Sequence, residues 1–185
     1  MYNGTMILSL DLSILQWFAH IRSIGGTYFF IGVSEMGNTM VVLGLAAIAA
    51  LALALKRRWP DIAGLALAVG GSGVVGLALK ALVERQRPDW HYAAFIEPDY
   101  SFPSGHALKA VALYCFLAFI IARIWPAGRG RTAVPMLLLI LAFLISFGRL
   151  YLGVHYVSDV IAGTLLGTLG VYLGALLTRF LERRL

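Results

Sequence analysis

Five long apolar runs dominate the sequence and limit what it can fold into. Twenty uncharged residues separate Glu35 from Lys56, and 18 separate Asp61 from Lys80. The third run covers 104–124, with Lys109 near its start, and two more cover 132–148 and 160–178. A membrane-crossing helix needs about 20 apolar residues, and a helix satisfies its own backbone hydrogen bonds in lipid. We therefore predict an all-α, polytopic transmembrane helix bundle of about five spans, with six as the alternative.

The first 35 residues differ from these runs, because charged residues such as Asp11 interrupt their apolar pattern. Their apolar and aromatic side chains nonetheless fall roughly on one side of a helix. A helix lying in the membrane interface accounts for both features, and Gly25-Gly26 is expected to end it. We predict a single membrane-embedded domain over 1–185, made of an N-terminal interfacial segment (1–35) and a helix bundle (36–182).

Glycines recur at a helical spacing in the last apolar run. Gly163 and Gly167 are four residues apart, and so are Gly170 and Gly174. Small residues at this spacing let two membrane helices approach closely, although glycine is also simply common in such helices. We expect this run to pack closely against its neighbours.

The basic residues divide unequally between the two sides of the predicted bundle. Nine of the fifteen lie on one side: Lys56, Arg57, Arg58, Arg123, Arg129, Arg131, Arg179, Arg183 and Arg184. Cytoplasmic loops are enriched in Lys and Arg, so we predict a multi-pass protein of the cell (inner) membrane with a cytoplasmic C-terminus. The longest polar loop, roughly 83–102, then lies on the periplasmic or extracellular side.

Three polar clusters interrupt the apolar runs, and all of them fall on that extracytoplasmic side. They are Lys80 with Arg87; Ser104, Gly105 and His106; and Arg149 with His155 and Asp159. Random placement would scatter such residues over both membrane faces. Their convergence at one face predicts a polar site there.

Lys80 and Arg87 are seven residues apart, close to two helical turns. One helix can present both on the same face, and Pro88 would then help to end that helix. The pair could hold an oxyanion. The alternative is that Lys80 snorkels towards the headgroups and Arg87 anchors the end of the helix.

Ser104, Gly105 and His106 follow Pro103 at the predicted start of a helix. Free backbone N–H groups at a helix start favour an anion, and Gly105 lets a phosphate come close without a clashing side chain. For Ser104 taken alone, a simple helix cap is the alternative.

His155 and Asp159 are four residues apart, so they are neighbours if they share a helix. A carboxylate that accepts one ring N–H fixes the tautomer and makes the other ring nitrogen a better nucleophile or base. The alternative is an ion pair at a helix start. It is disfavoured by Arg149 six residues upstream and by His106 on a neighbouring helix.

The cations of these clusters decide which ligand class fits. Two histidines and a carboxylate could hold a metal, but Lys80, Arg87 and Arg149 would repel a divalent cation and suit an oxyanion. We therefore expect no metal and no other cofactor. The net charge of +6 does not indicate nucleic acid, because the basic residues lie at the ends of apolar runs. The single cysteine, Cys115, permits no disulfide within the chain.

The clusters form a three-part pattern: Lys80-x6-Arg87-Pro88, then Pro103-Ser104-Gly105-His106, then Arg149-x5-His155-x3-Asp159. This pattern closely resembles the signature of the type 2 phosphatidic acid phosphatase (PAP2) superfamily, in its bacterial membrane lipid phosphatase branch, over about residues 60–175. Two departures accompany the resemblance. The third motif usually begins Ser-Arg, whereas this chain has Gly148-Arg149. Many bacterial relatives have six spans, whereas here the interfacial segment replaces the first span.

The resemblance implies an enzyme, a metal-independent hydrolase of phosphoric monoesters or lipid pyrophosphates. His155 would attack phosphorus and form a phosphohistidine, Asp159 would orient it, and His106 would protonate the leaving oxygen and then activate water. The residues implied to bind the phosphate are Lys80, Arg87, Ser104, Gly105 and Arg149. Electrostatic stabilisation of the transferred group carries most of the catalysis in phosphoryl transfer.

A site at the membrane surface favours a lipid phosphate over a soluble sugar phosphate, because a lipid can reach it from the leaflet. By resemblance the candidates are undecaprenyl pyrophosphate, phosphatidylglycerol phosphate and phosphatidic acid. The loop 89–100 is expected to touch the headgroup through interfacial aromatic residues. The alternatives are a lipid phosphotransferase with the same phosphohistidine and a non-catalytic phospholipid-binding membrane protein. The sequence leaves the oligomeric state open.

Overall fold

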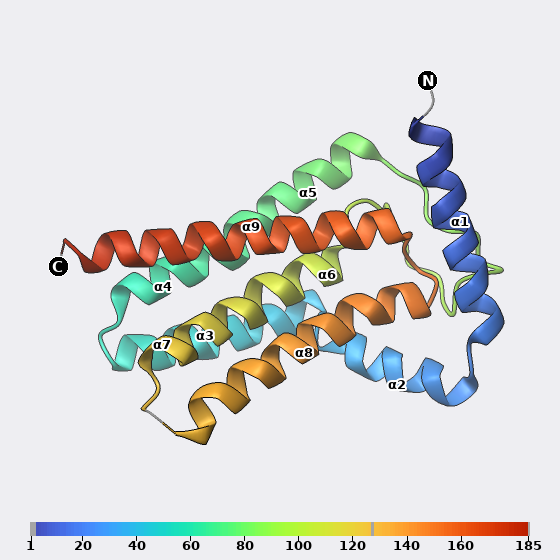
Figure 1. Cartoon of the computed structure of the whole chain (residues 1–185). Helices are drawn as coiled ribbons and strands as arrows, with labels where there is room; N and C mark the ends of the chain where they lie inside the picture. Colours follow the sequence, from blue (N-terminus) through green and yellow to red (C-terminus); the bar gives the residue numbers. More distant parts are fainter. Residues whose placement is uncertain (1–2, 127, 185) are drawn as a thin grey trace.

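The computed structural model describes residues 3–126 and 128–184, and within these ranges the chain forms helices and loops without strands. Helix α1 (Asn3–Ile21) lies across one end of the molecule. The other helices run as a bundle between that end and the opposite one, where the C-terminus lies (Figure 1).

Four helical stretches are long and apolar enough to cross a membrane. The first two each contain a π-helical turn: α4 (Trp59–Ala66), η1 (Leu67–Gly71) and α5 (Ser72–Val83); then α6 (Gly105–Ala110), η2 (Val111–Cys115) and α7 (Phe116–Ile124). The other two are α8 (Arg129–Tyr151) and α9 (Val157–Glu182). Helices α2 (Ile24–Glu35) and α3 (Thr39–Leu55), which are bent by 45° relative to each other, are together long and apolar enough to make a fifth span. The prediction of an all-α bundle with about five spans is confirmed.

The N-terminal segment divides differently from the sequence-based expectation. Helix α1 ends at Ile21, and Gly25-Gly26 lies in the first turn of α2 instead of ending the first helix. The reason is Ser23, whose hydroxyl accepts the Gly26 N–H at 3.1 Å and caps α2. Helix α2 packs against α8, so only α1 lies across the end of the bundle.

Helix α9 packs along one face against α4, α6 and both π-helical turns, while much of its apolar surface stays exposed on the outside of the bundle. Its glycines make this contact possible. A Cβ atom at Gly163 would lie 2.5 Å from the Ser104 carbonyl oxygen, and one at Gly174 would lie 2.5 Å from that of Gly64. The predicted close packing is confirmed, and at Gly163 it holds the start of α6 directly against α9.

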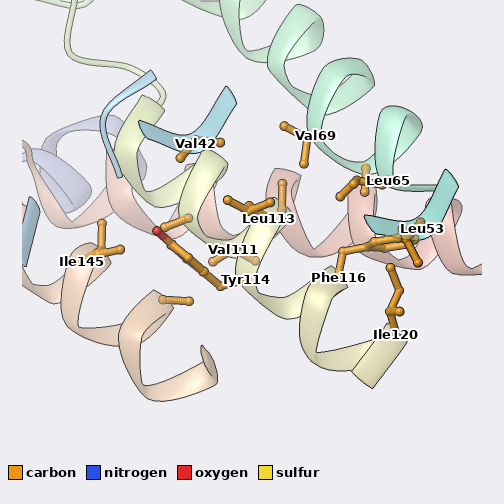
Figure 2. Packing of buried hydrophobic residues seen from close by; sticks show 14 residues of the cluster. Val42, Leu53, Leu65, Val69, Val111, Leu113, Tyr114, Phe116, Ile120 and Ile145 are labelled. Atoms are coloured by element: carbon orange, nitrogen blue, oxygen red, sulfur yellow. The ribbon is translucent and has the colours of Figure 1, made fainter. Parts of the chain in front are cut away.

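A buried apolar cluster fills the space between the helices (Figure 2). Val42 of α3, Leu65 of α4, Leu113 of η2, Phe116 of α7 and Ile145 of α8 all belong to it. Large apolar side chains also cover the outside of the bundle, including Leu77 of α5 and Leu137 and Phe143 of α8. Helices that are apolar on every side suit a bundle surrounded by lipid.

A charged cluster ties the helices together at the end remote from α1. Asp61 is fully buried and accepts hydrogen bonds from Arg58 at 2.5 Å and from Arg123 at 2.6 Å. Glu182 at the end of α9 pairs with the same two arginines. Pairing is what makes a buried carboxylate tolerable, so this cluster joins the ends of α4, α7 and α9.

Candidate active site

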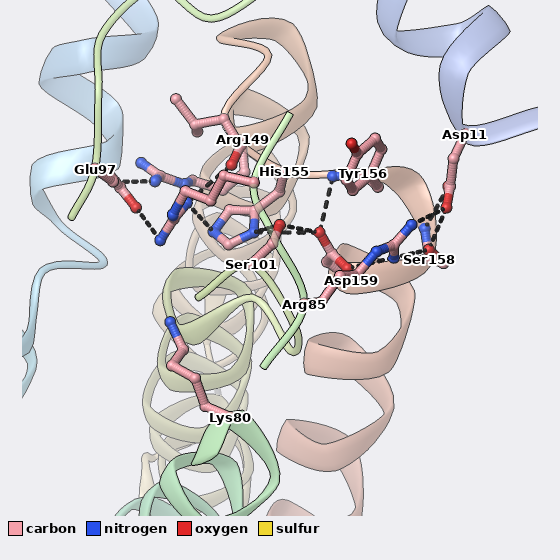
Figure 3. A network of polar contacts seen from close by, with 12 residues as sticks. Asp11, Lys80, Arg85, Glu97, Ser101, Arg149, His155, Tyr156, Ser158 and Asp159 are labelled. Carbon is pink, nitrogen blue, oxygen red and sulfur yellow. Dashed lines mark hydrogen bonds and ion pairs between the residues drawn. The ribbon is translucent and has the colours of Figure 1, made fainter. Parts of the chain in front are cut away.

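The three predicted clusters lie at the end of the bundle that α1 covers. Figure 3 shows Lys80 of the first cluster and Arg149, His155 and Asp159 of the third, and the Ser104 N–H donates a hydrogen bond to the Asp159 carbonyl at 3.0 Å. Lys80 lies in the last turn of α5, and Ser104 to His106 lie at the start of α6. Arg149 lies in the last turn of α8, and His155 and Asp159 lie around the start of α9. Four helix ends therefore supply one polar site.

Arg87 reaches the site from a loop, so the prediction that it shares a helix with Lys80 is wrong. Helix α5 ends at Val83, and Glu84 adopts a left-handed backbone conformation with φ of 47°. Residues before a proline disfavour helix, and Pro88 follows Arg87. The Arg87 side chain is held by two backbone carbonyls instead, those of Asp99 at 2.7 Å and Val154 at 2.8 Å.

Two loop carboxylates, which the sequence analysis did not identify, bind the three cations. Asp99 accepts a hydrogen bond from Lys80 at 2.6 Å and also pairs with Arg87. Glu97 pairs with Arg149, and its other oxygen lies 2.6 Å from Arg87 Nη2. Lys80, Arg87 and Arg149 therefore face one shared group of oxygen atoms, which is the arrangement that an oxyanion requires.

Both carboxylates remain ionised at neutral pH. Burial opposes the ionisation of Asp99, but hydrogen bonds from Lys80 and Arg87 outweigh it and lower its pKa to about 2. Burial also opposes the ionisation of Glu97, yet the charges of Arg149 and Arg87 lower its pKa as well. An incoming phosphate must compete with these two anions for the same cations.

His155 is buried and its two ring nitrogens have different partners. Nδ1 lies 3.5 Å from Asp159, and Nε2 lies 3.2 Å from Arg87 Nη1. Because an arginine N–H can only donate, Nε2 is the acceptor and carries the lone pair, and the proton is on Nδ1. Burial lowers the pKa of His155 to about 4, against the opposing hydrogen bond of Asp159. The ring is therefore neutral at pH 7.

Both carboxylate oxygens of Asp159 have hydrogen-bond or ionic partners, and one of these partners is itself bound to α1. Its Oδ2 accepts hydrogen bonds from Ser101 at 2.5 Å and from the Tyr156 N–H at 2.9 Å. Its Oδ1 pairs with Arg85 at 2.6 Å, and the other Arg85 nitrogen pairs with Asp11 of α1 at 2.8 Å. Asp11 is 3% exposed. A continuous chain of charges therefore joins α1 to the His–Asp pair (Figure 3).

Ser104 precedes α6 but makes no side-chain cap hydrogen bond, so the helix-cap alternative is wrong. Its hydroxyl is buried and has no hydrogen-bond partner among the residues that the structure describes, and the same holds for Nε of Arg149. Buried polar atoms are normally paired. Two orphaned atoms among the predicted phosphate-binding residues indicate where ligand oxygens fit.

His106 lies beside the bend between α2 and α3. A Cβ atom at Gly37 in that bend would lie 3.2 Å from His106 Cδ2, so the glycine lets the bend pack against the ring. The His106 side chain makes no hydrogen bond to the described part of the chain. It is therefore available to a ligand in the site.

Gly148 stands where the related motif has serine. A Cβ atom there would lie 2.9 Å from Phe30 and 3.5 Å from the Ser34 hydroxyl, both in α2. A serine at this position would thus face α2 and not the cations. The departure removes no group from the site.

A groove of about 330 Å³ extends from the site between α3, α5 and α6. Lys80, Asp99 and Lys109 line its polar end, whereas most of the remaining lining is apolar or glycine. A larger cavity of about 710 Å³ lies at the opposite end of the bundle, beside Lys56 and Trp125. None of the predicted site residues lines that larger cavity.

A bundle of membrane-length helices with three cations gathered at a buried His–Asp pair defines an integral membrane protein whose polar site suits an oxyanion. The chain belongs to the PAP2 superfamily, whose sequence pattern matches residues 61–183. It is accordingly an enzyme, a membrane lipid phosphatase of the PAP2 type. The family resemblance seen in the three motifs is confirmed.

Known relatives resemble the chain over most of its length. It is 31% identical to phosphatidylglycerophosphatase B of Bacillus subtilis over 144 residues, which are 77% of this chain and 70% of the relative. It is 34% identical to decaprenylphosphoryl-5-phosphoribose phosphatase of Mycobacterium tuberculosis, over 74% of this chain and 71% of the relative. The crystal structure of a transmembrane PAP2-type phosphatidylglycerolphosphate phosphatase from Bacillus subtilis has a TM-score of 0.85 at 28% identity, covering 98% of this chain and 89% of that one.

Five residues that contact the predicted site residues were not predicted from the sequence: Asp11, Arg85, Glu97, Asp99 and Ser101. The signal that could have found four of them is the scarcity of charge, because only 13% of the chain is charged. A charged residue near the predicted site needs a partner there. Ser101 carries no comparable signal.

Proposed function

We propose that this enzyme hydrolyses a phosphate monoester or pyrophosphate of a membrane lipid through a phosphohistidine on His155. The observation that carries the proposal is the orientation of the His155 ring. Its Nδ1 faces Asp159, and its Nε2 lone pair faces Arg87 at 3.2 Å. A nucleophile held in this way points at the cations that would bind the phosphoryl group.

The reaction proceeds in two steps. First, Nε2 of His155 forms a bond to phosphorus as the bond to the lipid oxygen breaks, and His106 gives a proton to that oxygen. Next, His106 takes a proton from water, the water oxygen attacks phosphorus, and the phosphorus–nitrogen bond breaks to release orthophosphate. Asp159 stabilises the imidazolium that forms in between.

The cations bind the phosphoryl oxygens in both steps. Lys80, Arg87 and Arg149 exchange the carboxylates of Glu97 and Asp99 for these oxygens, and Ser104 and Gly105 contribute at the start of α6. Donors fixed in place before the reaction stabilise the developing charge without reorganising. No step of this scheme uses a metal.

The groove supports a lipid as the substrate. Its polar end at Lys80 and Asp99 and its largely apolar lining match a phosphate joined to a long hydrocarbon chain. Two relatives are named for lipid phosphates of this kind. We propose undecaprenyl pyrophosphate, phosphatidylglycerol phosphate and phosphatidic acid as candidates, with the site on the extracytoplasmic side.

Phosphate release by the detergent-purified enzyme tests the proposal. The three lipids and glucose 6-phosphate would be assayed with EDTA present, alongside His155→Ala. We expect release from at least one lipid, and we expect His155→Ala to reduce kcat by at least about a thousandfold, as for loss of a nucleophile. His20→Ala, an exposed change in α1, is the matched control and should keep its activity.

Other outcomes would reassign the function. Substantial hydrolysis by His155→Ala would remove that residue from the nucleophile's role. Transfer of phosphate to a second lipid without release to water would identify a phosphotransferase. Lipid binding without either reaction would identify a binding protein.

A further inference from the structure

Lys109 differs from the other cations around the site because no carboxylate in the described part of the chain forms an ion pair with it. Lys80, Arg85, Arg87 and Arg149 each pair with at least one Asp or Glu. Lys109 instead donates a hydrogen bond from Nζ to the Thr39 hydroxyl of α3, at 2.5 Å. Among the described residues, no carboxylate forms an ion pair with it. A half-buried ammonium without a directly paired carboxylate can take its counter-ion from a ligand.

The position of Lys109 connects the site with the groove. It lies one helical turn farther along α6 than Gly105, and its side chain runs back towards that residue. A Cβ atom at Gly105 would lie 3.9 Å from Lys109 Cε. Lys109 also lines the groove together with Lys80, Asp99 and Thr39. The ammonium therefore lies where the phosphate site opens into the groove.

We infer that Lys109 and Thr39 form a subsite for a second anionic phosphoryl group of the substrate. The inference rests on the proposed function. A lipid with its terminal phosphate on Lys80, Arg87 and Arg149, and with its chain in the groove, must pass its connecting atoms beside Lys109. Those atoms include a second phosphoryl group in a lipid diphosphate and in phosphatidylglycerol phosphate, but not in phosphatidic acid.

The subsite selects between these substrates by charge. A phosphoryl oxygen beside Lys109 receives a charge-assisted hydrogen bond, which is stronger than one between neutral groups. The Thr39 hydroxyl, which now accepts from Lys109, can turn to donate to the same oxygen. The uncharged glycerol and ester atoms of phosphatidic acid gain much less from the same lysine.

Selectivity measurements on Lys109→Met test the inference. The value of kcat/KM would be measured for undecaprenyl pyrophosphate, phosphatidylglycerol phosphate and phosphatidic acid. We expect the preference for a two-phosphoryl lipid over phosphatidic acid to fall at least about tenfold, mainly through KM, as for the loss of one charge-assisted hydrogen bond. Lys109→Arg should restore much of the preference. Lys56→Met, at the other end of α3, is the matched control and should keep it.

Comparing the two lipids that carry two phosphoryl groups shows which kind of second phosphoryl group the subsite binds. A fall for undecaprenyl pyrophosphate alone assigns the inner phosphate of a diphosphate, and a fall for phosphatidylglycerol phosphate alone assigns a phosphodiester. A lysine that merely reaches for the membrane surface would alter kcat/KM for all three lipids by the same factor. An unchanged preference in Lys109→Met would overturn the inference.

A binding measurement keeps the test independent of turnover. In the His155→Ala background, we expect inorganic pyrophosphate to bind more tightly than orthophosphate, and Lys109→Met to remove this difference. Equal affinities in the His155→Ala protein would refute the subsite even if the enzyme proves active. Conversely, a preference that Lys109→Met removes would support the subsite even if none of the three lipids is hydrolysed.

Discussion

At the scale of single residues, His155 shows how neighbours prepare a side chain for chemistry. Its two ring nitrogens face groups of opposite charge, Asp159 and Arg87. The Asp159 carboxylate accepts a hydrogen bond from the proton on Nδ1 and so fixes the tautomer. The Arg87 guanidinium can only donate, so Nε2 must present its lone pair. Burial then keeps the ring neutral by lowering its pKa to about 4. A neutral ring with its lone pair directed at the cations is what a nucleophile at phosphorus requires.

The pH dependence of the reaction follows from this pKa. Because the lowered pKa keeps His155 neutral down to about pH 4, the nucleophile is lost only as the pH falls through that value. The value of kcat/KM reports ionisations of the free enzyme. We therefore expect protonation of His155 to lower kcat/KM only below about pH 4. Rates between about pH 4 and pH 8 would be corrected for titration of the substrate phosphate, measured separately by phosphorus NMR. A corrected acidic limb near 6.5, the ordinary pKa of histidine, would contradict the assignment.

At the scale of elements, α1 contributes to the site although it lies outside the bundle. Its Asp11 pairs with Arg85, which pairs with Asp159, and Asp11 also accepts the Ser158 N–H at 3.0 Å. Helix α1 is thereby tied to Asp159, the residue that we propose orients His155. Arg85 further packs over the Tyr156 ring, 4.1 Å from its centroid.

Substituting Asp11 tests whether this tie matters for catalysis. Asp11→Asn keeps the shape and can still accept the Ser158 N–H, but it leaves Arg85 with one ionic partner. We expect kcat to fall about tenfold with little change in KM, the size expected for a lost charged hydrogen bond. Ser13→Ala, an exposed position on the same helix, should behave as wild type. If Asp11→Asn changed KM and left kcat alone, Asp11 would act on substrate binding and not on the His–Asp pair.

At the scale of the whole molecule, the two ends of the bundle carry different charged clusters. One end holds the site with its paired cations, and the other holds Asp61 and Glu182 between two arginines. Nine of the fifteen basic residues lie towards the second end or in its loops. Because cytoplasmic loops are typically rich in Lys and Arg, we predict that the site lies on the extracytoplasmic side.

Cysteine labelling tests this orientation. The native Cys115 would first be replaced by alanine, and single cysteines introduced at His91, exposed in the loop near the site, and at Arg184, exposed near the C-terminus. We expect a membrane-impermeant maleimide to label His91→Cys on intact cells, and Arg184→Cys only after lysis. The reverse pattern would invert the topology.

The helix bundle and the positions of the three polar clusters could be predicted from the sequence. Apolar length and helical spacing are local properties, so the crossings and the glycines of α9 could be read directly. The three motifs could be recognised in the same way, because their residues lie at or next to the ends of apolar runs.

The remaining contacts of the site depend on how distant segments meet in the folded chain. Asp11 and Asp159 are 148 residues apart and meet through Arg85, and no local pattern relates them. Glu97 and Asp99 lie in an irregular loop, whose path depends on its contacts with Arg87, Lys80 and Arg149. Arg87 itself leaves the expected helix for those contacts. Ion pairs between distant segments depend on distances in space, which hydrophobicity and spacing along a chain do not encode.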